Sequence, residues 1–130
     1  MLKFSIHTTA TLRSTSLLEK KQKWFVGARL FSGRPDPVWA ISRGSAGKLL
    51  RLWGQLAPYR GAKPIPPVLG YRGCFLEEHL SNRRWEAYGG VVSLGAETRY
   101  DPDRSFEEAL LNTAPPSLGI SASALLRTGG

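Results

Sequence analysis

Arginines stand beside aromatic residues and tight turns at three places in this sequence, and that combination suits molecular recognition. A guanidinium group is a planar fork of hydrogen-bond donors that fits carboxylates and backbone carbonyls, and it also stacks on aromatic rings. The three places are SGRPDPVW (32–39), LGYRGC (69–74) and the segment around Arg83 and Arg84. The candidate binding residues are therefore Arg34, Asp36, Trp39, Tyr71, Arg72, Arg83, Arg84 and Trp85.

The turn in SGRPDPVW is expected to be stiff. Each proline fixes its own φ and biases the preceding residue toward extended backbone, and here Arg34 and Asp36 each precede a proline. The two charged side chains are thus presented in few orientations. That suits a binding surface, and it also suits an ordinary rigid connection in which Arg34 pairs with Asp36 or Asp101. The residues leave both interpretations open.

The sequence offers no recognisable catalytic or metal-binding constellation. His7 and His79 each lack a second His or Cys at metal-ligand spacing. The string Gly44-Ser-Ala-Gly-Lys48 imitates a phosphate loop, but Leu49 stands where a Ser or Thr is required. We therefore expect no catalytic residue, no metal and no cofactor of the chain's own.

The carboxylates also give no clear acid–base pair. Glu77 and Glu78 are neighbours in an expected strand, so their side chains point to opposite faces. Asp101-Pro-Asp-Arg reads as a turn that leads into a helix cap. We expect the acidic residues to lie on the solvated surface, namely Glu77, Glu78, Asp101, Asp103, Glu107 and Glu108.

The apolar pattern predicts a small α+β domain. Expected strands cover 24–33, 69–78 and 83–95, with a short edge strand at 97–100, and a proline-rich extended loop covers 59–70. Expected helices cover 45–58, capped by Ser42 or Ser45, and 105–114, with Ser105 and Glu108 as a capping box. The predicted fold is an antiparallel sheet of three to four strands with two helices packed on one face. A sheet edge near Gly89-Gly90 would accept an added peptide strand.

Charge and composition divide the chain into three parts. The net charge is +8, and residues 1–23 carry five basic residues against one acidic residue. We expect a basic N-terminal extension (1–23), one domain (24–115) and a flexible C-terminal tail (116–130) that docks through Leu125 and Leu126. No apolar stretch approaches the roughly 20 residues of a membrane span. Cys74 is the single cysteine, which fits a reducing cytoplasm and a small half-buried residue in a strand.

Four segments together carry a resemblance to a known family: SGRPDPVW (32–39), LGYRGC (69–74), GGVV (89–92) and YDPDRSFEEALL (100–111). They resemble a family of small bacterial proteins with an SGRP(N/D)PxW turn, an LGYRGF strand and a final helix. Cys74 stands where that family has Phe, which favours a packing role there. In size, the chain is also similar to accessory subunits of ribosomally synthesised peptide pathways, such as those of 3-thiaglutamate and methanobactin. That similarity implies a precursor peptide and an iron-dependent enzyme as partners, with any iron in the partner enzyme.

Three functional hypotheses follow. The first is a cytoplasmic, non-catalytic subunit that docks a partner enzyme or an acidic peptide through the candidate binding residues. The second is a nucleic-acid-binding module that uses the basic arm 1–23 and stacks bases on Tyr71 and Trp85. The third is a small enzyme that uses Cys74 or the pair Asp101 and Asp103, for which the sequence supplies no base.

Overall fold

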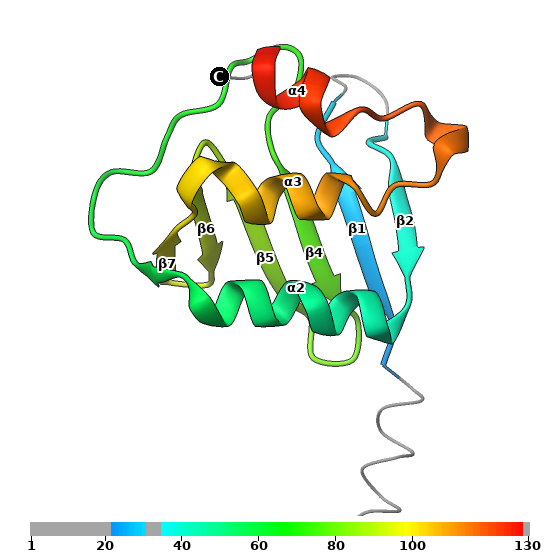
Figure 1. Cartoon of the computed structure of the whole chain (residues 1–130), viewed down its shortest axis with the longest axis horizontal. Helices are drawn as coiled ribbons and strands as arrows, with labels where there is room; N and C mark the ends of the chain where they lie inside the picture. The colour runs from blue at the N-terminus through cyan, green and yellow to red at the C-terminus, as the bar shows by residue number, and fades with distance from the viewer. Residues whose placement is uncertain (1–21, 31–34, 129–130) are drawn as a thin grey trace, which may run out of the picture.

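Within residues 22–30 and 35–128, which this computed structural model describes, a seven-stranded antiparallel sheet forms one layer of the molecule (Figure 1). The strand order is β2-β1-β4-β5-β6-β7-β3, so β2 and β3 are the edges. Every neighbouring pair is antiparallel. The strands are β1 (Trp24–Ala28), β2 (Val38–Ile41), β3 (Ala57–Pro58), β4 (Cys74–Glu78), β5 (Arg83–Tyr88), β6 (Val91–Leu94) and β7 (Glu97–Tyr100).

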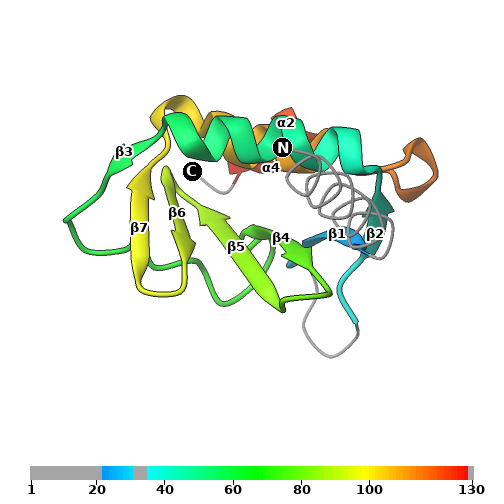
Figure 2. The ribbon, with the colours of Figure 1, turned by 90° about the horizontal axis from the view of Figure 1, so that it is seen from below.

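Helices form the second layer. Figure 2 shows all of them on one side of the sheet, while the loop between β3 and β4 passes across the other side, here called the open face. None of the described helices is long and apolar enough to cross a lipid bilayer. The helices are α2 (Arg43–Gln55), α3 (Ser105–Leu111) and α4 (Ala122–Thr128), with 3-10 turns η1 (Pro102–Arg104) and η2 (Pro116–Leu118).

The hydrophobic core fills the space between the layers. Because side chains alternate along a strand, every second residue of β1, β4 and β5 points toward the helices. Val26, Leu76 and Trp85 are the central buried side chains of these strands. From the helical side, Phe106 and Leu110 of α3 are fully buried against them. The sheet therefore has one face committed to packing and one face that the helices leave uncovered.

The α+β class is confirmed, but the expected numbers are wrong: the described residues form three helices rather than two and seven strands rather than three to four. The segment 83–95 is two strands, because Gly89 and Gly90 adopt positive φ (63° and 92°) and turn the chain back on itself. The residues VWAI after the proline turn form β2 and pair with β1. Gly89-Gly90 thus lies between two central strands, so the predicted peptide-accepting edge is not there.

The helix starts illustrate both a confirmed and a wrong prediction. Ser42 caps α2, with its Oγ accepting the Ser45 N–H at 3.1 Å. The Ser105–Glu108 capping box is wrong: the carboxylate of Asp101 accepts the N–H groups of Phe106 (2.8 Å) and Glu107 (3.1 Å) instead. Asp101 is therefore the residue that satisfies the first amides of α3.

Residues 116–128, the described part of the predicted tail, include helical structure. The segment forms η2 and α4, and α4 packs against α3. Leu125 and Leu126 pack partly buried against the core, so their predicted docking is confirmed. The predicted basic extension lies mostly outside the described residues, apart from residues 22 and 23.

Candidate binding site

The eight predicted binding residues do not form one surface. Trp39, Tyr71 and Trp85 are buried in the core, so they offer no exposed platform for stacking bases or peptide rings. Arg34 lies outside the described residues. Asp36 is engaged locally, because its Oδ1 accepts the Leu30 N–H at 2.8 Å and so closes the turn before β2.

The two neighbouring arginines of β5 diverge. Arg84 donates to Glu77 on the open face, where its guanidinium lies 4.4 Å from the centre of the Phe75 ring. Arg83 lies 5.1 Å from the Trp85 ring and donates to Ser81 at 3.0 Å. Both arginines make intramolecular contacts, on opposite sides of the strand.

Trp39 has a structural role at the junction of β2 and α3. Its Nε1 donates to Thr113 Oγ1 at 2.8 Å, and Thr113 Oγ1 donates in turn to the Leu110 carbonyl at 2.7 Å. The indole thus ties the edge strand to the end of α3. The SGRPDPVW segment therefore fixes the position of β2 through Asp36 at one point and through Trp39 at another.

A buried network, here called the Glu107 cluster, consists of Tyr71, Gly89, Asp101, Arg104 and Glu107. The Glu107 carboxylate accepts two hydrogen bonds from Arg104 (2.8 Å each), one from the Gly89 N–H (3.1 Å) and one from the Tyr71 hydroxyl. Asp101 N–H donates to the Gly90 carbonyl at 2.8 Å. The prediction that the carboxylates are solvated is wrong for Glu78, Asp101 and Glu107, since all three are buried.

Burial sets the protonation of the groups around this cluster. Desolvation raises the pKa of Tyr71 and of Cys74 well above their ordinary values, and the nearby negative charge of Glu107 adds to both effects. The Cys74 thiol donates to the Glu107 carbonyl at 3.7 Å and is fully enclosed. A protonated, enclosed thiol is a poor nucleophile. The hydrogen bonds that Arg104 donates to the Glu107 carboxylate raise the pKa of Arg104, which fits a guanidinium held in an ion pair.

The Glu107 cluster joins residues from three of the sequence segments quoted above. Tyr71 comes from LGYRGC, Gly89 from GGVV, and the remaining members from YDPDRSFEEALL. These segments meet because the fold brings the loop before β4, the β5–β6 turn and the start of α3 together. Their shared contribution is to hold the helical layer on the sheet.

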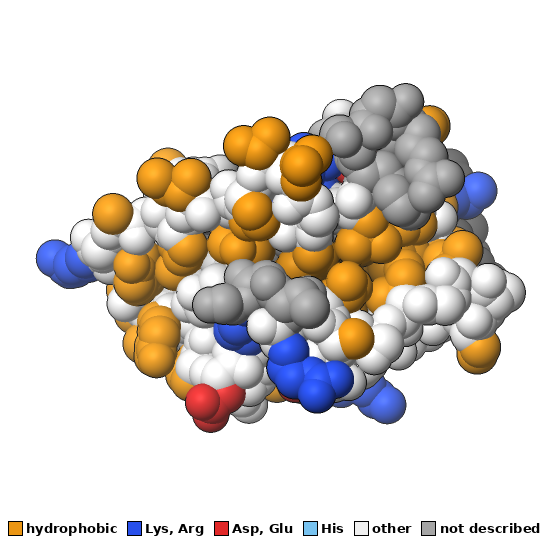
Figure 3. Space-filling view, turned by 90° about the horizontal axis from the view of Figure 1, so that it is seen from above, with side chains coloured by type: hydrophobic (Ala, Val, Ile, Leu, Met, Phe, Trp, Pro, Cys, Tyr) orange, Lys and Arg blue, Asp and Glu red, His pale blue; other side chains and the backbone are white. Residues whose placement is uncertain are grey.

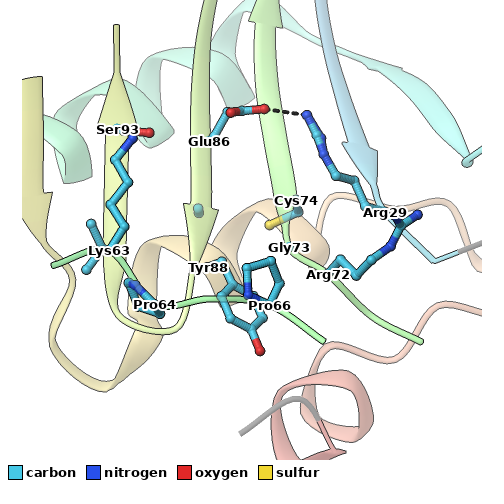
Figure 4. A pocket seen from close by; sticks show the side chains of 12 residues that line it. Arg29, Lys63, Pro64, Pro66, Arg72, Gly73, Cys74, Glu86, Tyr88 and Ser93 are labelled. Carbon is cyan, nitrogen blue, oxygen red and sulfur yellow. Dashed lines mark hydrogen bonds and ion pairs between the residues drawn. The ribbon is translucent and has the colours of Figure 1, made fainter. Parts of the chain in front are cut away.

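A cleft of about 320 Å³, here called the loop cleft, lies on the open face where the proline-rich loop crosses β5 and β6 (Figure 4). Pro64, Pro66 and Tyr88 form apolar walls, and Val91 belongs to the same lining. The volume falls at the lower end of the range for small-ligand and side-chain sites. The residues that line it are Arg29, Lys63, Pro64, Pro66, Arg72, Gly73, Cys74, Glu86, Ala87, Tyr88, Val91 and Ser93.

The polar groups of the loop cleft have a surplus of positive charge. Three basic residues line it, Arg29, Lys63 and Arg72, against one carboxylate, Glu86. Arg29 forms an ion pair with Glu86, and it also lies 5.0 Å from the centre of the Phe75 ring. Figure 4 shows Arg29 and Arg72 on one side of the cleft and Lys63 and Ser93 on the other. A carboxylate entering between them would meet cations from both sides.

The loop that forms one wall of the cleft also exposes aliphatic side chains. Ile65, Val68 and Leu69 are 91, 84 and 72% exposed. Figure 3 views the end of the molecule on which α4 lies, and hydrophobic side chains are spread over that end with Lys and Arg side chains around them. Exposed aliphatic side chains in one loop gain stability when the apolar side chains of a partner cover them.

Of the seven predicted residues that the structure describes, Arg72 alone lines the loop cleft. Sequence reasoning missed Arg29, Lys63 and Glu86, which come from the end of β1, the proline-rich loop and β5. The run KPIPPVL (63–69) could have indicated an exposed loop in the sequence. Its prolines prevent a helix, so its aliphatic side chains cannot be buried on a helix face. Arg29 and Glu86 come close together because of the order of the strands in the sheet, and that order cannot be predicted from the sequence pattern.

The described residues contain no group of three or more His, Cys, Asp or Glu side chains that could hold a metal ion. Comparison of the chain with family models, with characterised proteins and with solved structures finds no match.

Proposed function

We propose that this protein is a non-catalytic binding subunit that docks an acidic segment of a partner protein or peptide in the loop cleft. The observation that carries the proposal is the meeting of surplus positive charge in the cleft with exposed aliphatic residues on the loop beside it. Carboxylates of the partner would bind near Lys63 and Arg72, and its apolar side chains would cover Ile65 and Val68. The family resemblance adds a setting, namely a precursor peptide and partner enzyme of a ribosomally synthesised peptide pathway.

Two features favour a protein or peptide over a nucleic acid. Single-stranded nucleic acids bind to grooves with exposed aromatic rings, whereas the aromatic residues Tyr71 and Trp85 of this protein are buried. A phosphate backbone offers no apolar surface to bury exposed aliphatic side chains such as Ile65. The apolar side chains of a protein do, and burying them together stabilises the complex. A nucleic acid could bind the basic N-terminal extension (1–23), so the experiment below includes a single-stranded oligonucleotide.

Fluorescence anisotropy tests the proposal with a labelled peptide in which glutamate and leucine alternate. Matched probes are the lysine–leucine peptide and a single-stranded oligonucleotide of similar length. We expect the acidic peptide to bind more tightly than the lysine peptide. The Lys63→Glu, Arg72→Glu double variant should bind the acidic peptide at least about tenfold more weakly than the wild type does. Lys48→Glu, a charge reversal at an exposed position of α2, is the control and leaves binding within about twofold.

Two results would contradict the proposal. If Lys48→Glu weakens binding as much as the double variant does, the attraction is general and the cleft is not the site. If only the oligonucleotide binds, with an affinity that falls steeply with salt, the nucleic-acid hypothesis replaces the proposed one.

A further inference from the structure

The two edges of the sheet differ in how they are protected. Exposed strand edges attract other strands, and proteins block them with short strands, prolines or charged side chains. At one edge, β3 has two residues and ends in Pro58. At the other edge, β2 has four residues, VWAI, and none of them is charged. Among the described strands, only β1 pairs with β2, so none of them covers the outer side of β2.

The register of β1 and β2 shows which backbone groups face outward. The Ala28 N–H donates to the Pro37 carbonyl at 3.1 Å, so this is a hydrogen-bonded pair. In an antiparallel ladder, hydrogen-bonded pairs alternate with pairs that exchange no hydrogen bonds. Trp39 lies opposite Val26, so these two residues form the next hydrogen-bonded pair. The N–H and C=O groups of Val38 and Ala40 consequently point away from β1. Both side chains are exposed, that of Val38 by 53%.

We propose that β2 pairs antiparallel with β2 of a second copy of this chain, so that the two sheets become continuous. With Trp39 opposite Trp39 of the second copy, Val38 and Ala40 form hydrogen-bonded pairs with Ala40 and Val38 of that copy. The same strand thus complements itself around a two-fold axis. This inference is independent of the loop cleft.

The charges at the two ends of β2 favour a second copy in this orientation. Asp36 precedes the strand and Arg43 follows it. In the antiparallel register, Asp36 of one copy comes beside Arg43 of the other copy at both ends, whereas a parallel register would bring like charges together. Those pairs offset locally the repulsion between two chains of net charge +8.

Apolar surface adjacent to β2 adds to the same contact. η2 projects past β2 at the same end of the molecule (Figures 1 and 2), and its Leu118 is 43% exposed. Both copies would keep their helices on the same side of the joined sheet, because the two-fold axis is perpendicular to it. η2 of each copy then approaches the helical layer of the other.

Sedimentation velocity over a range of concentrations tests the proposal on the full chain. We expect the wild-type chain to dimerise. Ala40→Pro removes an outward N–H that β1 does not use, and it is expected to raise the dimer dissociation constant at least about tenfold. Val38→Lys places a charge on the edge strand and is also expected to raise the dimer dissociation constant. Leu80→Lys, the same kind of change at an equally exposed position between β4 and β5, is the control and leaves dimerisation unchanged.

Circular dichroism shows whether each variant is folded, and Val38→Lys keeps the test valid if Ala40→Pro does not fold. Hydrogen exchange adds a local reading, because the Val38 and Ala40 amides should become protected as concentration rises. A wild-type chain that stays monomeric at the highest concentration overturns the proposal. So does a dimer that survives both edge substitutions, since it must then form elsewhere.

Discussion

At the scale of single residues, Glu107 joins separate parts of the fold through one buried carboxylate. Its carboxylate receives hydrogen bonds from Arg104, Gly89 and Tyr71, and its own backbone N–H is held by Asp101. A buried ion pair stabilises a fold only while both partners remain. The cluster therefore makes the position of α3 depend on one acidic side chain.

Substitution of Glu107 tests that dependence. Glu107→Gln removes the charge that faces Arg104 in the buried cluster, so we expect the free energy of unfolding to fall by about 3 kcal/mol. Glu108→Gln is the matched control, because Glu108 is the exposed neighbour on the same helix, and it should change stability by less than about 0.5 kcal/mol. Urea denaturation measures both. Equal effects of the two substitutions would show that the cluster contributes nothing specific.

Alkaline pH provides a second test at this scale. Burial raises the pKa of Cys74 and Tyr71 in the folded protein above the ordinary values of 9.0 and 10.0. Above about pH 9 the unfolded chain therefore loses protons that the folded chain keeps, and stability falls as pH rises. Each group contributes a slope of up to about 1.4 kcal/mol per pH unit.

Urea denaturation between about pH 8 and pH 10.5 measures that slope. Cys74→Ala removes one of the two groups, so the decline between about pH 9 and pH 10 should become shallower whatever the starting stability of the variant. An unchanged slope in the variant would mean that the Cys74 thiol ionises as easily in the folded protein as in the unfolded chain.

At the scale of elements, the open face of the sheet carries its own packing. The Phe75 ring of β4 lies across Gly27 of β1, and Arg29 and Arg84 lie over the same ring, 5.0 and 4.4 Å from its centre. A Cβ atom at Gly27 would come within 2.3 Å of the ring. The arginines restrict the ring from moving aside, so Gly27 is needed for this arrangement.

Two alanine substitutions should therefore have opposite effects. Gly27→Ala is expected to lower the free energy of unfolding by about 1–3 kcal/mol, because its methyl group would overlap the Phe75 ring. Gly54→Ala, in α2 with no atom near its added methyl group, should raise it by about 0.5–1 kcal/mol through helix propensity. Thermal or urea denaturation compares them. A neutral Gly27→Ala would show that the ring is free to move.

The success of sequence reasoning also differed by element. The stripe of Leu49 and Trp53 predicted α2 correctly, because a helix carries its pattern within one short segment. β2 was missed, because its four residues follow two prolines and become a strand only through pairing with β1. The start of α3 was located, but its cap was assigned to Ser105, since the left-handed backbone at Asp103 and Arg104 carries no sequence signal.

At the scale of the whole molecule, the candidate site could not be read from the sequence. The loop cleft unites the end of β1, the proline-rich loop and strands β5 and β6. Arg29 meets Glu86 only because β4 inserts between β1 and β5 in the sheet. The segment LGYRGC contributes Tyr71 to the Glu107 cluster and Arg72 to the cleft, while the less conspicuous run KPIPPVL forms the exposed wall of the cleft.

The central claim is that the loop cleft holds an acidic segment of a partner. The most direct test is a titration of the isotope-labelled protein with the glutamate–leucine peptide, followed by amide chemical shifts. We expect the largest shifts at Lys63, Arg72, Gly73 and Ser93, and we expect them to vanish in the Lys63→Glu, Arg72→Glu variant. Shifts gathered on α2, or scattered evenly over the surface and equal in that variant, would contradict the central claim.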